Sequence, residues 1–333
     1  MPLLKVLWRF DLGNLGVRIF FVISGFLITA ILLKEDSTSG SIGLRRFYAR
    51  RLLRIGPAYY VFLAAMALAG GFAIVEVKPH DFLPPLTYTT NYFATTFVLG
   101  HTWSLSVEEQ FYLLWPGALF VLGRRRAFTL AAVLIVFAPF ARLLCVHYPE
   151  LFGSPRYAFP AVSDALACGC FLALLRERLQ KSRAYRGLLG SRWFVVVPGA
   201  IVLAQCAPAA AKDLFLYTLI NILIAVSIDR VTRFPSSWSG RVLNAKPMVL
   251  VGTLSYSLYL WQQPFLDPAS ALVFPVNVVA LVVIALASYQ LVEKPALAWG
   301  RKRLPHDSSA VLSAESRVVQ GEDARYTVRS GAK

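Results

Sequence analysis

Long apolar stretches separated by short polar segments dominate the chain. A helix crosses the roughly 30 Å apolar core of a bilayer with about 20 residues, or somewhat fewer where the bilayer adapts. On that criterion the pattern predicts nine membrane-spanning helices, which run approximately over residues 16 to 33, 57 to 77, 103 to 122, 127 to 147, 157 to 175, 193 to 208, 213 to 229, 247 to 266 and 270 to 292. The expected fold is therefore all-α, a polytopic transmembrane helical bundle.

Residues 82 to 100 are uncharged and numerous enough to cross a membrane, yet they include two prolines and five threonines, which suit a loop or re-entrant piece better. Cytoplasmic loops collect Lys and Arg. Six lie in 34 to 56, three in 124 to 126, six in 176 to 192, four in 229 to 246 and four in 293 to 306, against three in the intervening loops. A span over 82 to 100 would reverse every later loop, so we expect an outer-face segment there.

The beginning of the chain does not fit this alternation. Nine spans with a cytoplasmic C-terminus place the first residues outside, although they carry Lys5, Arg9 and Arg18. We therefore expect a further helix upstream of this sequence; the alternative is that a short N-terminus was translocated. After Leu304, Ser, Glu, Asp, Arg and Gly replace apolar residues. This change predicts a membrane domain over 1 to 304 and a disordered cytoplasmic tail over 305 to 333.

Composition agrees with a bilayer, because 57% of the residues are hydrophobic and only 16% are charged. A net charge of +16 could suit nucleic acid. The basic residues lie between apolar runs rather than on a polar surface, however, so we expect no nucleic-acid partner. The four cysteines all fall within predicted spans and are expected to be small core residues, with neither a zinc site nor a disulfide. They are Cys145, Cys168, Cys170 and Cys206.

Polar residues inside the predicted spans are the candidates for chemistry, because an ionisable group in a bilayer is costly and usually faces a protein interior or a wet cavity. In the span over 103 to 122, Ser104, Glu108 and Tyr112 recur on one stripe of the helix, and Glu109 lies on a second polar edge. Two adjacent acids need a cation or water. We expect Arg142 of the next span as a partner, which leaves a structural ion pair and a catalytic or binding role equally open.

The sequence leaves the role or the partner of three further polar features open. His101, at the outer edge of its span, is either a base or an interface residue that forms a hydrogen bond. Asp164 lies in the middle of a span and needs an interior contact. An arginine cluster just before a proline either fixes the topology or binds phosphates. It comprises Arg50, Arg51 and Arg54.

Five motifs occur in a fixed order along the chain. They are "FFVISGFLIT" at 20 to 29, "RRFYARRLLRIGPAYY" at 45 to 60, "HTWSLSVEEQFYLLWP" at 101 to 116, "SYSLYLWQQPF" at 255 to 265 and "LVEKPALAW" at 291 to 299. Together they resemble acyltransferase family 3, the bacterial integral membrane O-acyltransferases that modify surface polysaccharides, lipopolysaccharide, peptidoglycan or secreted small molecules. The resemblance covers the chain up to about residue 304.

The resemblance implies a bundle of about ten helices in the bacterial inner membrane. An acyl group, commonly acetyl, passes through it from cytoplasmic acyl-CoA to a hydroxyl of a carbohydrate or lipid-linked glycan. Acyl-CoA is then a co-substrate, and no bound cofactor or metal is expected. The arginine cluster would hold the CoA phosphates. Ser104, Glu108 and Glu109 would line the interior passage, and we include His101 among the catalytic candidates.

Two departures from the family pattern affect the expected activity. Family members carry a histidine on their first helix that resembles a general base, whereas this chain has no histidine before His80. Gln262 replaces a second histidine in "LYLWQQP", and glutamine cannot shuttle protons. We therefore expect the chain as printed to be catalytically incomplete, and we keep a non-catalytic transporter or flippase as the alternative. Glu293 is equally open between a family role and helix termination.

Overall fold

The computed structural model describes residues 11–267 and 272–303, and within these ranges every regular element is a helix. The predicted tail over 305 to 333, the first ten residues and the start of the last predicted span lie outside the described residues. The elements are α2 (Leu12–Ser39), α3 (Leu44–Gly71), η1 (Pro79–Phe82), α4 (Leu83–Leu86), α5 (Phe97–Gly100), α6 (Trp103–His147), α7 (Pro149–Phe152), α8 (Phe159–Lys181), α9 (Arg183–Gly190), η2 (Arg192–Val195), α10 (Val196–Gln205), α11 (Ala209–Ala211), η3 (Lys212–Leu216), α12 (Tyr217–Arg233), α13 (Trp238–Leu243), α14 (Lys246–Leu266), α15 (Val276–Ser288), η4 (Tyr289–Glu293) and α16 (Lys294–Arg303).

Six helical stretches in the described ranges are long and apolar enough to cross a membrane, or seven if a bent pair counts as one span, so nine spans are not confirmed. The predictions over 16 to 33, 57 to 77, 157 to 175, 213 to 229 and 270 to 292 overlap five of these stretches. The prediction over 193 to 208 overlaps the bent pair, in which α9 is bent by 68° from the helices that follow. The prediction over 247 to 266 matches α14, a helix that is not among the six.

The two spans predicted over 103 to 122 and 127 to 147 form a single element, α6, with a break inside it. At Gly123 the backbone adopts φ 69° and ψ 170°, which is not helical. This positive φ favours glycine, because a side chain would be strained there. The boundary expected between the two spans is therefore confirmed as a break in α6.

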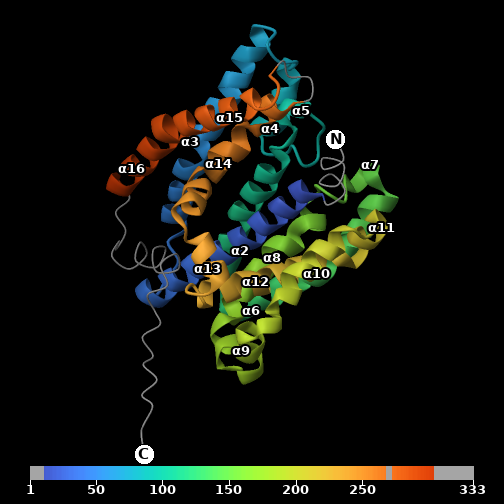
Figure 1. The fold of residues 1–333 in the computed structure, drawn as a ribbon, viewed down its shortest axis with the longest axis vertical. Helices are drawn as coiled ribbons and strands as arrows, with labels where there is room; N and C mark the ends of the chain where they lie inside the picture. The colour runs from blue at the N-terminus through green and yellow to red at the C-terminus, as the bar shows by residue number, and fades with distance from the viewer. Residues whose placement is uncertain (1–10, 268–271, 304–333) are drawn as a thin grey trace, which may run out of the picture.

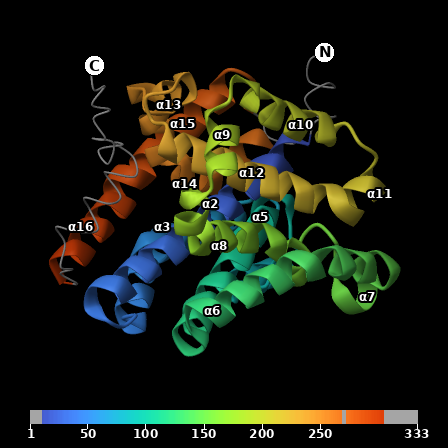
Figure 2. The same ribbon diagram turned by 90° about the horizontal axis from the view of Figure 1, so that it is seen from below.

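The helices form two groups that lie side by side (Figure 1). In one group, α8 packs along both α2 and α6, and α12 packs against α8. In the other, α14 packs on α15, and α3 contacts both α14 and α16. Figure 2, turned by 90°, also shows α3 and α16 on one side of the molecule and α6, α7 and α11 extending to the other. Each group has its own buried apolar core.

The first half of α6 joins the two groups. Leu105 belongs to the core shared with α3 and α14, whereas Val107, Phe111 and Trp115 belong to the core shared with α2 and α8. Two residues along a helix turn the side chain by about 200°, to the opposite face, so one helix can serve both cores. The polar stripe of α6 therefore lies at the junction of the two groups.

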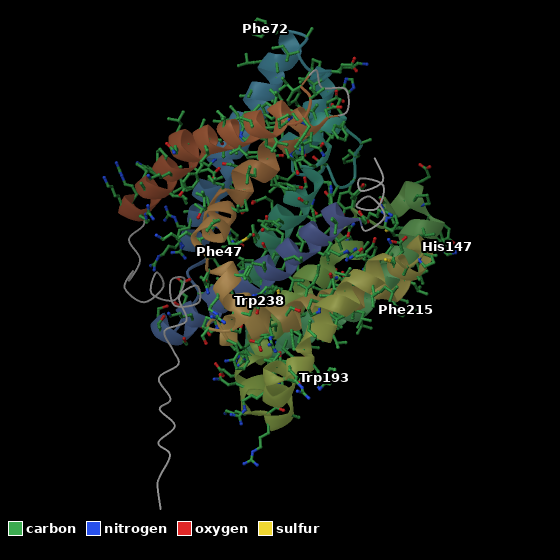
Figure 3. All side chains as sticks on the ribbon, in the orientation of Figure 1. Phe47, Phe72, His147, Trp193, Phe215 and Trp238 are labelled. Carbon is green, nitrogen blue, oxygen red and sulfur yellow. The ribbon has the colours of Figure 1, made fainter. Side chains whose placement is uncertain are left out.

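The outside of the bundle is strongly apolar. Figure 3 shows Phe72, Trp193 and Phe215 at the periphery of the ribbon, and their side chains are 77%, 69% and 61% exposed. Apolar exposure on this scale would be unfavourable in water and is expected where lipid surrounds the protein. Together with the apolar helices, it makes the chain a multi-pass membrane protein.

The segment over 82 to 100 consists of short helices and turns, as its prolines and threonines predict. The Tyr59 hydroxyl of α3 donates a hydrogen bond to the carbonyl of Pro85 at 2.9 Å. This contact ties the segment to the second helix group. Its position on the outer face stays a prediction.

The cysteines follow the sequence prediction with one exception. Cys145, Cys168 and Cys170 are buried, in keeping with small core residues. Cys206, at the C-terminal end of α10, is exposed, so the prediction of a core position is wrong for this residue. Cys206 is the C-cap residue of α10, one position beyond the buried Gln205.

Candidate functional site

A pocket of about 960 Å³ lies where α2 and the first half of α6 begin, beside the C-terminal half of α14. Its volume falls in the range of small-molecule binding sites. The residues over 90 to 97 and 154 to 157 contribute to the wall. Side chains from α2, α6 and α14 and from the residues just before α2 and just after α5 complete it, and they include Asp11, Asn14, His101, Ser104, Tyr259 and Gln262. Two of the predicted catalytic candidates, His101 and Ser104, therefore line one cavity.

Tyr259 connects these two candidates. Its hydroxyl donates to the backbone carbonyl of His101 at 2.6 Å and lies 2.5 Å from Oγ of Ser104. Nε2 of the His101 ring lies 3.0 Å from the carbonyl of Leu260. A carbonyl only accepts, so we assign the ring proton to Nε2. His101 therefore makes an interface contact with α14, and its role as a base stays a prediction.

Glu108 lies one helical turn beyond Ser104 and is only 2% exposed. Ser24 of α2 donates a hydrogen bond to its Oε1 at 2.5 Å, and the Tyr112 hydroxyl donates to the same oxygen. The guanidinium of Arg51 lies 4.2 Å from the centroid of the Tyr112 ring. Two hydroxyl groups thus hold the Glu108 carboxyl group, and the guanidinium of Arg51 lies over the ring of the tyrosine that carries one of them.

Neither glutamate lines the pocket. The pocket reaches Ser104, and Glu108 lies about 6 Å further along the helix axis. A continuous passage lined by all of these candidates, as the resemblance implies, is not seen among the described residues. The polar stripe of α6 instead continues past the end of the pocket as hydrogen-bonded side chains.

Glu109 faces a different neighbourhood from Glu108. Its Oε1 is buried and makes no hydrogen bond within the part of the chain that the structure describes. Tyr88, in the segment before α5, lies near enough for the charge of Glu109 to act on its hydroxyl. Burial, followed by the charge of Glu109, raises the pKa of the Tyr88 hydroxyl. The two adjacent acids therefore have different hydrogen-bond partners, although the charges of Glu108 and Arg51 both act on Glu109.

The arginine cluster lies on α3 at the opposite end of the α6 stripe from the pocket. Arg50 lies 3.9 Å from a carboxylate oxygen of Glu35 on α2. The charges of Arg51 and Arg54 both act on the carboxyl group of Glu108. The structure thus brings two members of the cluster close to Glu108, while the third approaches Glu35, a buried acid of α2.

Glu293 lies within a helix rather than at its end. It closes the π-helical turn η4, from which α16 continues to Arg303, so helix termination is the wrong explanation. The side chain is 6% exposed and accepts a hydrogen bond from Ser257 of α14. The charge of Arg54 also acts on it. Arg54 therefore lies near two buried acids from different helices.

Arg142 does not pair with either glutamate, which corrects the sequence prediction. Its Nη1 lies 3.0 Å from Oδ2 of Asp164, and both side chains are fully buried. Thr218 adds a hydrogen bond to the same carboxylate oxygen at 2.5 Å. Arg142 lies on the second half of α6, beyond the break, where α8 and α12 are its neighbours. The interior contact that Asp164 was expected to need is confirmed.

Sequence reasoning missed Ser24 and Tyr259 as members of the site. Both lie inside two of the ordered motifs, "FFVISGFLIT" and "SYSLYLWQQPF". A serine and a tyrosine in an apolar helix carry no charge, so intramembrane charge did not single them out. Their position in ordered motifs was the only signal in the sequence.

These features define a class, a multi-pass helical membrane domain with a polar site at the junction of two helix groups. A family model described as an acyltransferase domain matches residues 2–290. The chain belongs to this family, acyltransferase family 3, which confirms the resemblance seen in the motifs.

Among similar proteins are three bacterial O-acetyltransferases. The putative peptidoglycan O-acetyltransferase YrhL of Bacillus subtilis (strain 168) is 30% identical over 320 residues, covering 85% of this chain and 50% of the relative. The peptidoglycan O-acetyltransferase OatA of Listeria monocytogenes is 28% identical over 327 residues, covering 85% and 51%. The O-acetyltransferase OatA of Staphylococcus aureus (strain NCTC 8325 / PS 47) is 28% identical over 317 residues, covering 85% and 52%. The chain thus spans about half the length of these relatives. No solved structure matches it significantly.

Proposed function

We propose that this domain transfers an acyl group, most simply acetyl, from cytoplasmic acyl-CoA to a hydroxyl of a cell-surface glycan across the bacterial inner membrane. Family membership supports the acyl transfer. The names of two relatives specify peptidoglycan O-acetylation, which supports a peptidoglycan hydroxyl as the acceptor. The predicted cytoplasmic C-terminus places the arginine cluster on the donor side and the pocket on the acceptor side.

The observation that carries this proposal is the order of polar groups on α6. Ser104 lines the pocket, Glu108 follows after one turn, and Tyr112 follows after another with Arg51 above its ring. Eight residues of helix advance about 12 Å. The stripe therefore leads from the pocket toward the arginine cluster within about half the thickness of a bilayer.

Each end of the stripe suits one substrate. Arginine guanidinium groups bind phosphate oxygens through charge-assisted hydrogen bonds, and CoA carries several phosphates. The pocket offers hydroxyl, amide and carboxylate groups, which are hydrogen-bonding partners for a sugar. In this proposal Arg51 and Arg54 hold the donor, and the pocket holds the acceptor.

The transfer step forms one bond and breaks one. The acceptor oxygen bonds to the thioester carbonyl carbon as the carbon–sulfur bond breaks, the acceptor hydroxyl loses its proton, and the departing CoA thiolate gains one. His101 is the candidate base, because Nδ1 makes no hydrogen bond among the described atoms when Nε2 faces Leu260. We propose that Glu108 favours this proton transfer through its hydrogen bonds with Ser24 and Tyr112.

Labelled transfer tests the proposal. Membrane vesicles containing the protein are incubated with radiolabelled acetyl-CoA and peptidoglycan. The chain as printed is assayed beside a longer chain that includes its upstream reading frame. We expect alkali-labile label in the acceptor from at least the extended chain. No label with either chain, while a glycan still crosses the membrane, would contradict acyl transfer and favour the transporter alternative.

Replacement of the arginine cluster tests the donor site. Arg50→Ala, Arg51→Ala and Arg54→Ala together are expected to raise the apparent KM for acyl-CoA by roughly tenfold or more, because each charged hydrogen bond contributes about 1.5–3 kcal/mol. The KM for the acceptor should change much less. An equal rise in both constants would contradict a donor-binding role and indicate a role in fold or topology.

A further inference from the structure

A second pocket, of about 770 Å³, shares no lining residue with the first. It lies between the start of the second half of α6 and the C-terminal part of α8. Its wall is both basic and apolar, and consists of Arg124, Arg125, Phe128, Thr129, Leu174, Leu175, Glu177 and Arg178. Three arginines against one glutamate leave the pocket with a net positive charge.

Two of these arginines have no protein partner. Within the described ranges, the side chains of Arg125 and Arg178 make no hydrogen bond or ion pair. Arg124 does have partners, because its Nη2 lies 3.3 Å from Glu177 and 3.4 Å from the carbonyl of Leu174. The pocket therefore presents two unengaged guanidinium groups beside a third that a carboxylate partly neutralises.

The pocket lies at the membrane surface, because the apolar parts of two helices end beside it. The apolar first half of α6 ends at the break at Gly123, and the apolar part of α8 ends before Arg176. Because charged side chains in the hydrocarbon core are costly, both helices must reach the membrane surface at these points. Apolar groups lie directly beside the charges, and Phe128 stacks on Phe171 of α8 with ring centroids 4.6 Å apart.

We propose that this pocket binds an anionic phospholipid, with its phosphate between Arg125 and Arg178 and an acyl chain against Phe128 and Leu175. Guanidinium groups recognise phosphate oxygens, and basic pockets between helices at the membrane surface suit lipid headgroups. A free phosphate has the same charge but gains nothing from the apolar wall. The combination of both wall types therefore favours a lipid over a soluble phosphate.

The test uses the full chain in nanodiscs or detergent and measures retained lipid by native mass spectrometry. Phosphatidylglycerol is compared with phosphatidylcholine at equal concentration. We expect preferential retention of phosphatidylglycerol. Arg125→Ala with Arg178→Ala should weaken its binding roughly tenfold or more, because each arginine near the membrane surface increases the affinity for an anionic lipid about fivefold. Arg126→Ala is the matched control, because this neighbouring exposed arginine does not line the pocket.

A gain-of-binding variant guards against misfolding as an explanation. Glu177→Gln removes the carboxylate that neutralises Arg124 and should tighten phosphatidylglycerol binding severalfold. Equal retention of the two lipids, or equal losses in the double variant and in Arg126→Ala, would overturn the proposal. Displacement of the lipid by millimolar inorganic phosphate or by CoA would also overturn it and assign the pocket to a soluble phosphate.

Discussion

At the scale of single residues, Arg142 shows how a charge is accommodated inside this bundle. Its guanidinium is fully buried and contacts Asp164, Thr218 and two backbone carbonyls, those of Ala161 and Asp213. A buried charge with this many partners is stable only while the partners remain. The pair therefore holds α6, α8 and η3 in one arrangement, without contacting the pocket.

Arg142→Ala should destabilise the protein by about 3 kcal/mol or more, because it leaves Asp164 buried without its cation. The midpoint of thermal unfolding in detergent measures this effect. Replacing both residues together, Arg142→Met with Asp164→Leu, should recover much of the loss. The exposed Arg126→Ala should leave the midpoint unchanged. A stable Arg142→Ala single variant would contradict the structural role.

Tyr259→Phe tests whether the pocket is held in shape for catalysis. The variant loses the hydroxyl that links Ser104 to the His101 carbonyl, and we expect transfer to fall roughly tenfold, as for the loss of about one hydrogen bond. Stability should fall by about 1–3 kcal/mol, because the partners of the hydroxyl are buried. Tyr148→Phe, at a 56% exposed position, is the control. Equal rates in Tyr259→Phe and wild type would remove Tyr259 from the site.

Helical periodicity predicted the faces of residues but not their neighbours. The spacing of Ser104, Glu108 and Tyr112 correctly gave one polar stripe, because residues four apart share a helix face. It could not say which helix would face that stripe, so Arg142 was assigned to the wrong acid. The partner of Glu108, Ser24, comes from a helix 84 residues earlier in the chain. Pairing across helices depends on the packing of the whole bundle.

At the scale of elements, the packing of α2 against α8 is close enough to require glycine. A Cβ atom added to Gly25 would overlap the carbonyl of Leu166, and one added to Gly169 would overlap the carbonyl of Val22. Small residues let membrane helices approach backbone to backbone. Because Ser24 lies next to Gly25, this approach also determines how near Ser24 comes to Glu108.

Gly25→Ala should therefore force the two helices apart. We expect a loss of about 1–3 kcal/mol or more in stability and a fall in transfer activity as Ser24 moves away from Glu108. Unfolding midpoint and labelled transfer measure the two effects. Gly252→Ala is the control, because an added Cβ meets nothing within 4 Å there. If Gly25→Ala behaves like the control, the close approach is not needed.

Hydropathy predicted the positions of the apolar helices along the chain better than it predicted the path of each helix through the membrane. It located the break at Gly123 through the arginines that follow, and it located α14, whose serine, tyrosine and glutamine residues lower its hydropathy below that of the other spans. The 68° bend before α10 was missed. Bends of this kind arise from packing and local backbone geometry, which an apolar window does not record.

At the scale of the whole molecule, the two helix groups meet along the first half of α6. Leu105 packs into one group and Phe111 into the other, while Glu108 lies between them. The pocket opens at one end of this junction, and Arg51 and Arg54 approach from the other. We therefore propose that acyl transfer takes place along this junction and depends on the carboxyl group of Glu108.

The initial rate of acetyl transfer in Glu108→Gln tests this dependence, with Glu150→Gln on the exposed α7 as the matched control. Glutamine keeps the size and hydrogen-bonding capacity of the side chain but not its charge. We expect the rate to fall roughly 100-fold or more, with normal membrane insertion and no change in the control. A Glu108→Gln rate equal to that of the wild type would contradict it.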